Sequence, residues 1–206
     1  KYQGDNFSPK GHKYIREYSS DTVPRTLYRV GGVIFSKEKV FSLYENRIMI
    51  KYTLEDAHSA TTLRFRPFLA FRSVKSLTQA NGNVNQSYTE VPNGIKTCMY
   101  HGYPELYMQF NKKVKFVYEP YWYNGIEYPK EQERGYPYKE DLYDPGYFEI
   151  PIKKGESIIF SAGDSPVATT RLKSLYENEV NARTPRTSFF NCLKNSAQQF
   201  YFRPKE

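Results

Sequence analysis

Several residue types and sequence features that would define a class of protein are scarce or missing. The 206-residue chain has two cysteines, one tryptophan and three isolated histidines, and it has no C-x-x-C pair, so we expect no metal site. No run approaches the roughly 20 apolar residues that cross a bilayer, so we expect no membrane partner. A phosphate loop, a dinucleotide fingerprint and a serine nucleophile elbow are also missing, so no cofactor is expected.

The start of the chain and its cysteines suggest where the protein resides. No apolar run follows the first residues, so a signal peptide is not recognised. Without an export signal, Cys98 and Cys192 are expected to be free thiols in a reducing compartment, the cytoplasm. The chain does not begin with methionine, so we expect it to be part of a longer protein.

Aromatic residues and positive charge are what the chain has in quantity. Its 20 tyrosines and 14 phenylalanines argue against disorder, because disordered chains are poor in aromatics. The 30 Lys and Arg against 22 Asp and Glu leave a net charge of +8, which attracts phosphate. Acidic residues are interleaved with the basic ones throughout, however, so we keep a nucleic-acid-binding β domain only as an alternative.

Short β-like runs separated by turn residues dominate the first three-quarters of the chain. Alternation of polar and apolar residues over 62–68 is typical of a half-buried strand. Further strands are predicted at 26–30, 33–35, 40–44, 47–54, 95–100, 106–110, 114–119 and 157–160. Turns are predicted at 81–83, 92–94, 101–104 and 154–155. Many short strands without helices between them predict an all-β fold, a large antiparallel sandwich.

Two segments break this pattern. Residues 119–146 are rich in proline, tyrosine and charge and only weakly periodic, which predicts a long functional loop. After Gly163, Ser165-Pro166 predicts a helix start, and Leu172, Leu175, Tyr176 and Val180 follow at helical spacing. A second helix is expected after Thr184-Pro185, with Phe189, Leu193, Ala197 and Phe200 on one face.

Three groups of residues are candidates for a functional site, and each has a structural alternative. Arg64, Arg66 and Arg72 could orient sugar hydroxyls or a neighbouring domain, or could form ordinary ion pairs on a strand. Tyr121-Trp122-Tyr123 could form a stacking platform, or could fill the core of the domain.

The third group is a set of carboxylates, because glycoside hydrolysis needs two of them at a defined separation. They are Glu131, Glu133, Glu140, Asp141 and Asp144. Basic residues are interleaved with them, so we interpret this segment as ion-paired and assign no catalytic residue.

Two blocks of sequence, taken together, resemble the N-terminal domain of bacterial and archaeal glycogen debranching enzymes. The first block is residues 63–72, followed by 76–81, and the second is 122–128, followed by 133–135, 140–142 and 144–146. Residues 183–189 resemble the lead-in to the catalytic domain of that family. Residues 73–75 and 124–126 depart from the family pattern.

The resemblance implies a β-supersandwich, similar to galactose mutarotase, that precedes an α/α-barrel with amylo-α-1,6-glucosidase activity. It implies an N-terminal domain over 1–163, and a helical linker with the first barrel helix over 164–206. The barrel would carry the general acid and base, so this chain is expected to be non-catalytic. The residues expected to contact α-glucan or the barrel are Arg64, Arg66, Arg72, Trp122, Tyr123, Glu127, Tyr128 and Arg134. A free-standing carbohydrate-binding module is the alternative reading.

Overall fold

Alternation of buried and exposed side chains produces eleven strands in the described part of the chain. A computed structural model describes residues 1–4 and 7–200. The strands are β1 (Ile15–Ser19), β2 (Arg25–Val30), β3 (Val33–Phe41), β4 (Arg47–Asp56), β5 (Thr61–Phe65), β6 (Tyr88–Val91), β7 (Gly94–Thr97), β8 (Leu106–Phe110), β9 (Lys115–Glu127), β10 (Lys139–Ile152) and β11 (Ser157–Gly163). The helices are the 3₁₀ turns η1 (Gly11–Tyr14) and η2 (Thr169–Arg171), and α1 (Pro129–Glu133), α2 (Leu172–Asn181) and α3 (Phe189–Gln198).

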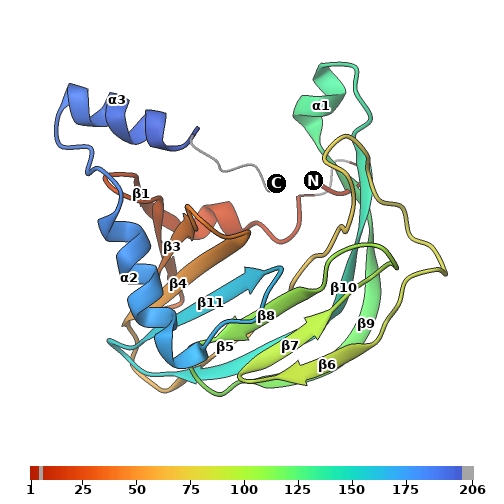
Figure 1. Cartoon of the computed structure of the whole chain (residues 1–206), viewed down its shortest axis with the longest axis horizontal. Helices are drawn as coiled ribbons and strands as arrows, with labels where there is room; N and C mark the ends of the chain where they lie inside the picture. The colour runs from red at the N-terminus through yellow and green to blue at the C-terminus, as the bar shows by residue number, and fades with distance from the viewer. Residues whose placement is uncertain (5–6, 201–206) are drawn as a thin grey trace.

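The strands form two antiparallel sheets that pack face to face. The large sheet has eight strands in the order β1-β2-β3-β4-β11-β8-β7-β6, and the small sheet has three in the order β5-β10-β9. Figure 1 shows the small sheet lying across one face of the large sheet, with α1 at the end of the β9–β10 hairpin. The predicted all-β sandwich is therefore confirmed.

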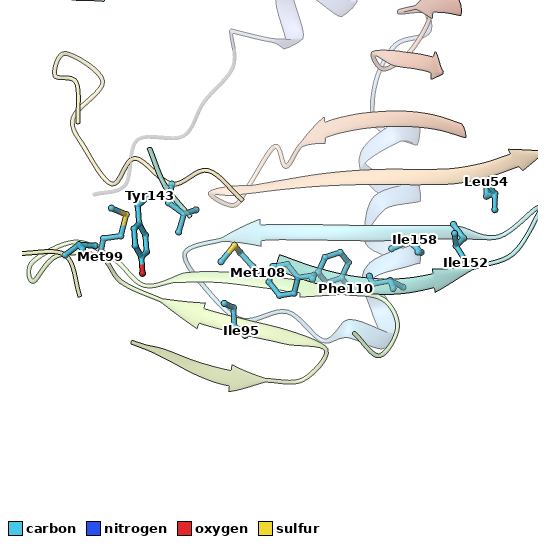
Figure 2. Packing of buried hydrophobic residues seen from close by; sticks show 12 residues of the cluster. Leu54, Ile95, Met99, Met108, Phe110, Tyr143, Ile152 and Ile158 are labelled. Carbon is cyan, nitrogen blue, oxygen red and sulfur yellow. The ribbon is translucent and has the colours of Figure 1, made fainter. Parts of the chain in front are cut away.

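The core lies between the two sheets. Ile95, Met108, Phe110 and Ile158 project from neighbouring strands of the large sheet and are at most 1% exposed. Figure 2 shows these side chains in one continuous apolar layer. Phe148 from the small sheet packs against Phe110, with 5.1 Å between the two ring centroids. Burial of large aromatic rings stabilises the contact between the layers, which accounts for part of the high aromatic content.

Helix α2 covers part of the opposite face of the large sheet. In β11 Ile158 belongs to the core between the sheets, whereas its neighbour Ile159 contributes to a second cluster on the other face. Leu172 and Tyr176 of α2 are 0% and 3% exposed in that cluster, as their helical spacing predicts. The predicted helix start at Ser165 is wrong, because the Arg47 guanidinium binds the Ser165 carbonyl and hydroxyl oxygens and holds this residue in a loop.

Most strand predictions agree with the structure, but the predicted loop over 119–146 is wrong. Most of this segment belongs to β9 and β10, the longest strands of the protein, joined through α1. The register of the hairpin shifts between Glu140 and Leu142 and again between Asp144 and Gly146. Each shift moves the following side chains to the other face, which removes the strict alternation that identifies a strand in the sequence.

Some of the other strand and turn predictions need smaller corrections. The strands predicted at 33–35 and 40–44 belong to one strand, β3, which ends at Phe41, and β1 and β6 were not predicted. The turn predicted at 92–94 joins β6 to β7, with Asn93 in the left-handed region at φ 53°. Both cysteines are free, and no helix of the described residues is long and apolar enough to cross a bilayer.

Helix α3 lies beyond α2 (Figure 1), and its Asn195 lines a cavity together with Tyr18 of β1 and Phe41 of β3. The Ser188 hydroxyl accepts the backbone N–H of Asn191 and caps its start. Phe189, Phe190 and Leu193 are 80%, 72% and 55% exposed, and Phe200 just beyond the helix is 82% exposed. The predicted apolar face of this helix is therefore present and contacts little of the sandwich. The division of the chain into domains at residue 163 stays a prediction, although β11 does end at Gly163.

Candidate functional site

The outer face of the small sheet brings two of the predicted arginines together with tyrosines. Arg64 of β5 lies opposite Glu149 of β10 in the register and forms an ion pair with it at 2.7 Å. The guanidinium carbons of Arg64 and Arg66 lie 4.2 and 4.7 Å from the ring centroid of Tyr147. Both cations therefore contact the ring of Tyr147, an attractive arrangement for a guanidinium group.

Arg66 also holds two carboxylates in place. Its guanidinium donates to Asp144 at 2.9 Å and to Glu119. These hydrogen bonds, that to Glu119 first, raise the pKa of Arg66. Asp144 is 0% exposed, and burial raises the pKa of its carboxyl although Arg66 and the N–H of Gly146 act in the opposite direction. A carboxylate so enclosed has no free face for a substrate.

Arg72 forms a separate network at the end of the small sheet. Its Nε and Nη2 donate to the two oxygens of Glu140 at 2.5 and 3.2 Å. Glu140 is 1% exposed and also accepts the Tyr128 hydroxyl at 2.5 Å and the Thr78 N–H at 3.0 Å. The network therefore ties together the segment after β5, the end of β9 and the start of β10.

Electrostatics keep Glu140 ionised despite its burial. Burial raises the pKa of its carboxyl, but the hydrogen bonds from Arg72, Tyr128 and Thr78 outweigh burial and leave the pKa below its usual value. Burial and the bond to Glu140 raise the pKa of Tyr128 to about 12, so its hydroxyl stays protonated as a donor. The Glu140 carboxylate is ionised and accepts four hydrogen bonds. It therefore holds the surrounding segments together and is a poor proton donor.

A groove lies next to this network. It has a volume of about 790 Å³ and is lined by Phe71 and Arg72, by Tyr103 and Glu105 of the β7–β8 connection, and by residues of the large sheet such as Ile48. Phe71 has a left-handed backbone, φ 37°, which is strained for a residue with a side chain. Its ring centroid lies 6.3 Å from that of Tyr103, which is 43% exposed. Two aromatic rings beside charged and polar groups are suited to the apolar face and hydroxyls of a sugar.

The three aromatic residues Tyr121–Tyr123 do not form one platform. Trp122 faces inward and packs against the core, 5.4 Å from the ring centroid of Tyr143. Tyr121 and Tyr123 lie on the outer face with ring centroids 4.6 Å apart, and Tyr123 meets Phe68 edge-on at 4.3 Å. Because a strand alternates its side chains, only two of three consecutive rings are available on the outer face.

Besides the inward-facing Trp122, two of the predicted residues lie outside both clusters. The Glu127 carboxylate is 3.4 Å from Nζ of Lys1, and the Glu127 carbonyl accepts the N-terminal amino group, so this residue anchors the start of the chain. Arg134 lies just after α1, where it pairs with Glu131 at 3.0 Å and stacks over Tyr136 at 5.0 Å. The structure therefore divides the predicted set into the Arg64–Arg66–Tyr123 face, the Arg72–Tyr128 network and three separate residues.

Some residues of these clusters were not predicted from the sequence. The register of β10 places Tyr147 beside Arg64 and Arg66, and the strained backbone at Phe71 places its ring near Tyr103. Short sequence motifs encode neither arrangement. Glu140 and Asp144 were expected to be ion-paired, and they are, but they are buried and their partners are Arg72 and Arg66 and not the basic residues interleaved with them in the sequence. Among residues 1–4 and 7–200, no cluster of three or more His, Cys, Asp or Glu side chains has the geometry to hold a metal ion.

These features define a β-sandwich domain whose buried carboxylates are bound by its own arginines and hydroxyls. The model of the family described as glycogen debranching enzyme N terminal matches residues 1–159, more than three-quarters of the chain. The chain therefore belongs to that family, as its sequence resemblance indicated. No curated protein matches the chain.

Proposed function

We propose that this chain is the non-catalytic N-terminal domain of a debranching-type glycoside hydrolase. In the parent protein, an α/α-barrel would hydrolyse α-1,6-linked glucose branch stubs, and this domain would pack on the barrel and support it. The observation that carries the proposal is the family match over residues 1–159, followed in the chain by a helix with an exposed apolar face. Residues 164–206 would be the linker and the first barrel helix.

The state of the carboxylates supports the non-catalytic role. An acid and a base for glycoside hydrolysis need access to the substrate and opposite protonation states. Glu140 and Asp144 are enclosed and bound to Arg72 and Arg66, and Glu131 pairs with Arg134 on the surface. Proton transfer would therefore come from another part of the parent protein.

The exposed face of α3 supports the packing role. Phe189, Leu193 and Phe200 recur at helical spacing and are each more than half exposed. A contiguous apolar surface of this kind marks an interaction site in a protein that is otherwise polar on its surface. Other helices of an α/α-barrel would cover it, because helices of such a barrel pack through apolar stripes.

The α3 proposal has a direct test. Leu193→Lys should weaken the binding of a hydrophobic dye to the isolated chain and leave the midpoint of urea unfolding unchanged, because Leu193 supports little of the sandwich. Lys194→Glu on the same helix is the matched control for a charge change. If Leu193→Lys lowers the unfolding midpoint, α3 is part of this domain's own core and the proposed docking face is withdrawn.

Glucan contact is the second part of the proposal. Arg64, Arg66 and Tyr123 on the small sheet, and Arg72 with Phe71 and Tyr103 at the groove, would position the glucan or the barrel rim. Trp122, Glu127 and Tyr128 would stiffen the strands beneath these contacts, and Arg134 would contribute at the α1 end. The groove with its two aromatic rings is also what favours the alternative of a free-standing carbohydrate-binding module.

The arginines of the small sheet argue against the nucleic-acid alternative. Arg64, Arg66 and Arg72 each have a carboxylate partner, so they offer little uncompensated charge to phosphates. A nucleic-acid-binding domain would show affinity for DNA or RNA that falls steeply with salt. We expect none in a filter-binding assay.

Affinity electrophoresis in glycogen gels, combined with a hydrolysis assay, tests the proposed function. The isolated chain should release no glucose from a branched limit dextrin, and release above that of a heat-denatured sample would contradict the non-catalytic role. Weak retardation by glycogen that Tyr103→Ala removes and Tyr136→Ala preserves would support groove contact. Strong retardation of the isolated chain would instead favour the free-standing module.

A further inference from the structure

A second cavity, lined by none of the predicted residues, lies where the α2–α3 connection crosses the β1–β2 edge of the large sheet. Its volume is about 410 Å³. The lining comes from both sheet and helices: Tyr18, Ser20, Thr22, Val23, Pro24, Lys39, Val40, Phe41, Ile48, Arg183, Arg186, Asn195 and Gln199. This size lies within the range of small-molecule binding sites.

The charged residues that line this cavity are all basic. Three of its lining residues, Lys39, Arg183 and Arg186, are basic, and none is acidic. Across residues 1–4 and 7–200, no carboxylate forms an ion pair with either Arg183 or Arg186, whereas Arg64, Arg66 and Arg72 all have one.

Arg183 is the more deeply placed of the two. It is 8% exposed, and its Nη2 donates to the carbonyl oxygen of Phe41. Its Nε is buried and has no hydrogen-bond acceptor among the described residues. A buried donor on a charged group is costly to leave unpaired, so the Nε proton of Arg183 calls for an acceptor that the described residues do not supply.

Arg186 is held in position by neutral groups. Its Nε donates to the Asn195 side-chain oxygen at 3.0 Å and its Nη1 to the Ser20 hydroxyl at 3.1 Å. Asn195 is 1% exposed and donates in turn to the Thr184 carbonyl at 2.6 Å, so the amide cannot turn away. The guanidinium is therefore oriented in advance, and no carboxylate of the described residues compensates its charge.

We propose that this cavity binds a phosphate monoester of a small polar molecule. Two arginine forks match the several oxygens and the double charge of a phosphoryl group better than a single carboxylate does. The hydroxyls of Ser20 and Thr22 line the cavity and supply further donors. The rings of Tyr18 and Phe41, 63% and 68% exposed, form walls against which the organic part of the ligand lies.

The site is tested with inorganic phosphate as the probe. Thermal unfolding of the full 206-residue chain is followed against phosphate concentration at constant ionic strength, with chloride and acetate as comparison anions. A ligand that binds only the folded state raises the melting temperature in a saturable way. We expect such a rise with phosphate, a weaker one with acetate and none with chloride.

Two variants remove the site in different ways. Arg186→Gln deletes one cation, and Ser20→Asp places a carboxylate where Arg186 Nη1 now donates to a hydroxyl. Both should weaken phosphate binding at least tenfold, and Ser20→Asp should do so while the protein becomes more stable without phosphate. Arg29→Gln, at an exposed position of β2 outside the cavity lining, is the matched control and should leave phosphate affinity unchanged.

The outcomes separate the alternatives. Equal stabilisation by phosphate and acetate, or an undiminished phosphate response in Ser20→Asp, would overturn the proposal. No response to phosphate in the unmodified chain would overturn it too, and would favour a carboxylate of another polypeptide as the partner of these arginines. Glucose 6-phosphate should bind more tightly than inorganic phosphate, and Tyr18→Ala should abolish that difference. Glycogen retardation is measured on the same samples, so failure here is distinguishable from failure of the proposed function.

Discussion

The two groups of arginines in this molecule differ in what surrounds them. On the small sheet, Arg64, Arg66 and Arg72 each bind a carboxylate from a neighbouring strand. In the cavity beside the α2–α3 connection, the guanidinium groups of Arg183 and Arg186 bind, within the described part of the chain, a backbone carbonyl, an amide and a hydroxyl and no carboxylate. The same residue type therefore supports the fold in one region and leaves a charge for a ligand in the other.

The difference has an energetic basis. Removing one member of a buried ion pair leaves the other charge buried and uncompensated, which is strongly destabilising. Removing a buried cation that has no anionic partner leaves no such charge behind. The two regions should therefore respond to substitution with very different magnitudes, and the predictions below run from the largest expected effect to the smallest.

The largest effect is expected for Arg72→Met. This change leaves the Glu140 carboxylate, 0% exposed, with no cationic partner. Loss of one partner of a buried pair costs about 3–5 kcal/mol, and we expect about 3 kcal/mol because Arg72 is one-quarter exposed. Urea unfolding monitored by fluorescence measures the change. If Arg72→Met/Glu140→Gln is no more stable than Arg72→Met alone, the cost does not come from the unpaired charge.

Acidification should produce a smaller loss at the same place. The folded-state pKa of Glu140 lies below its unfolded value, so the unfolded chain binds the proton more readily. The stabilisation is present above the unfolded pKa of about 4.3 and is lost as the pH falls through the folded pKa. The loss stays below that of Arg72→Met, because protonated Glu140 keeps hydrogen-bonding capacity. Glu140→Gln should flatten the stability profile below pH ~4.5, and an unchanged slope would contradict this assignment.

Arg183→Met should change stability little. It removes one hydrogen bond to the Phe41 carbonyl, a contribution of about 1 kcal/mol, and it also removes an uncompensated buried charge. These terms have opposite signs, so we expect the unfolding free energy to stay within about 1 kcal/mol of the unmodified protein. Urea unfolding in phosphate-free buffer is the measurement. A loss comparable to that of Arg72→Met would erase the contrast between the two groups.

Arg64→Met gives the smallest expected effect. Its partner Glu149 lies directly opposite in the sheet, but the Arg64 side chain is 55% exposed. Exposed pairs contribute about 0–1 kcal/mol, so we expect a loss of less than about 0.5 kcal/mol. A double-mutant cycle with Glu149→Gln isolates the pair. A coupling energy above about 1 kcal/mol would show that Arg64, like Arg72, forms an ion pair that stabilises the fold.

Much of the sandwich could be predicted from the sequence, and part of the site could not. The strand at 106–110 has the predicted limits, and Leu172 and Tyr176 are buried as helical spacing requires. The β9–β10 hairpin was missed because two register shifts and outward-facing tyrosines hide its alternation. Arg64, Arg66 and Arg72 were identified from their sequence, but their separation into an exposed face and an enclosed network was not predictable.

By itself the sequence determined the β class, the positions of most turns, the helical faces and the family, because these depend on local periodicity and residue type. Only the tertiary structure decided which cations have anionic partners. Pairing depends on register between strands far apart in the chain, as for Arg64 with Glu149, and on where a connection crosses a sheet edge, as for Arg183 and Arg186. Coulombic attraction depends on distance in space, and a count of +8 contains no distances.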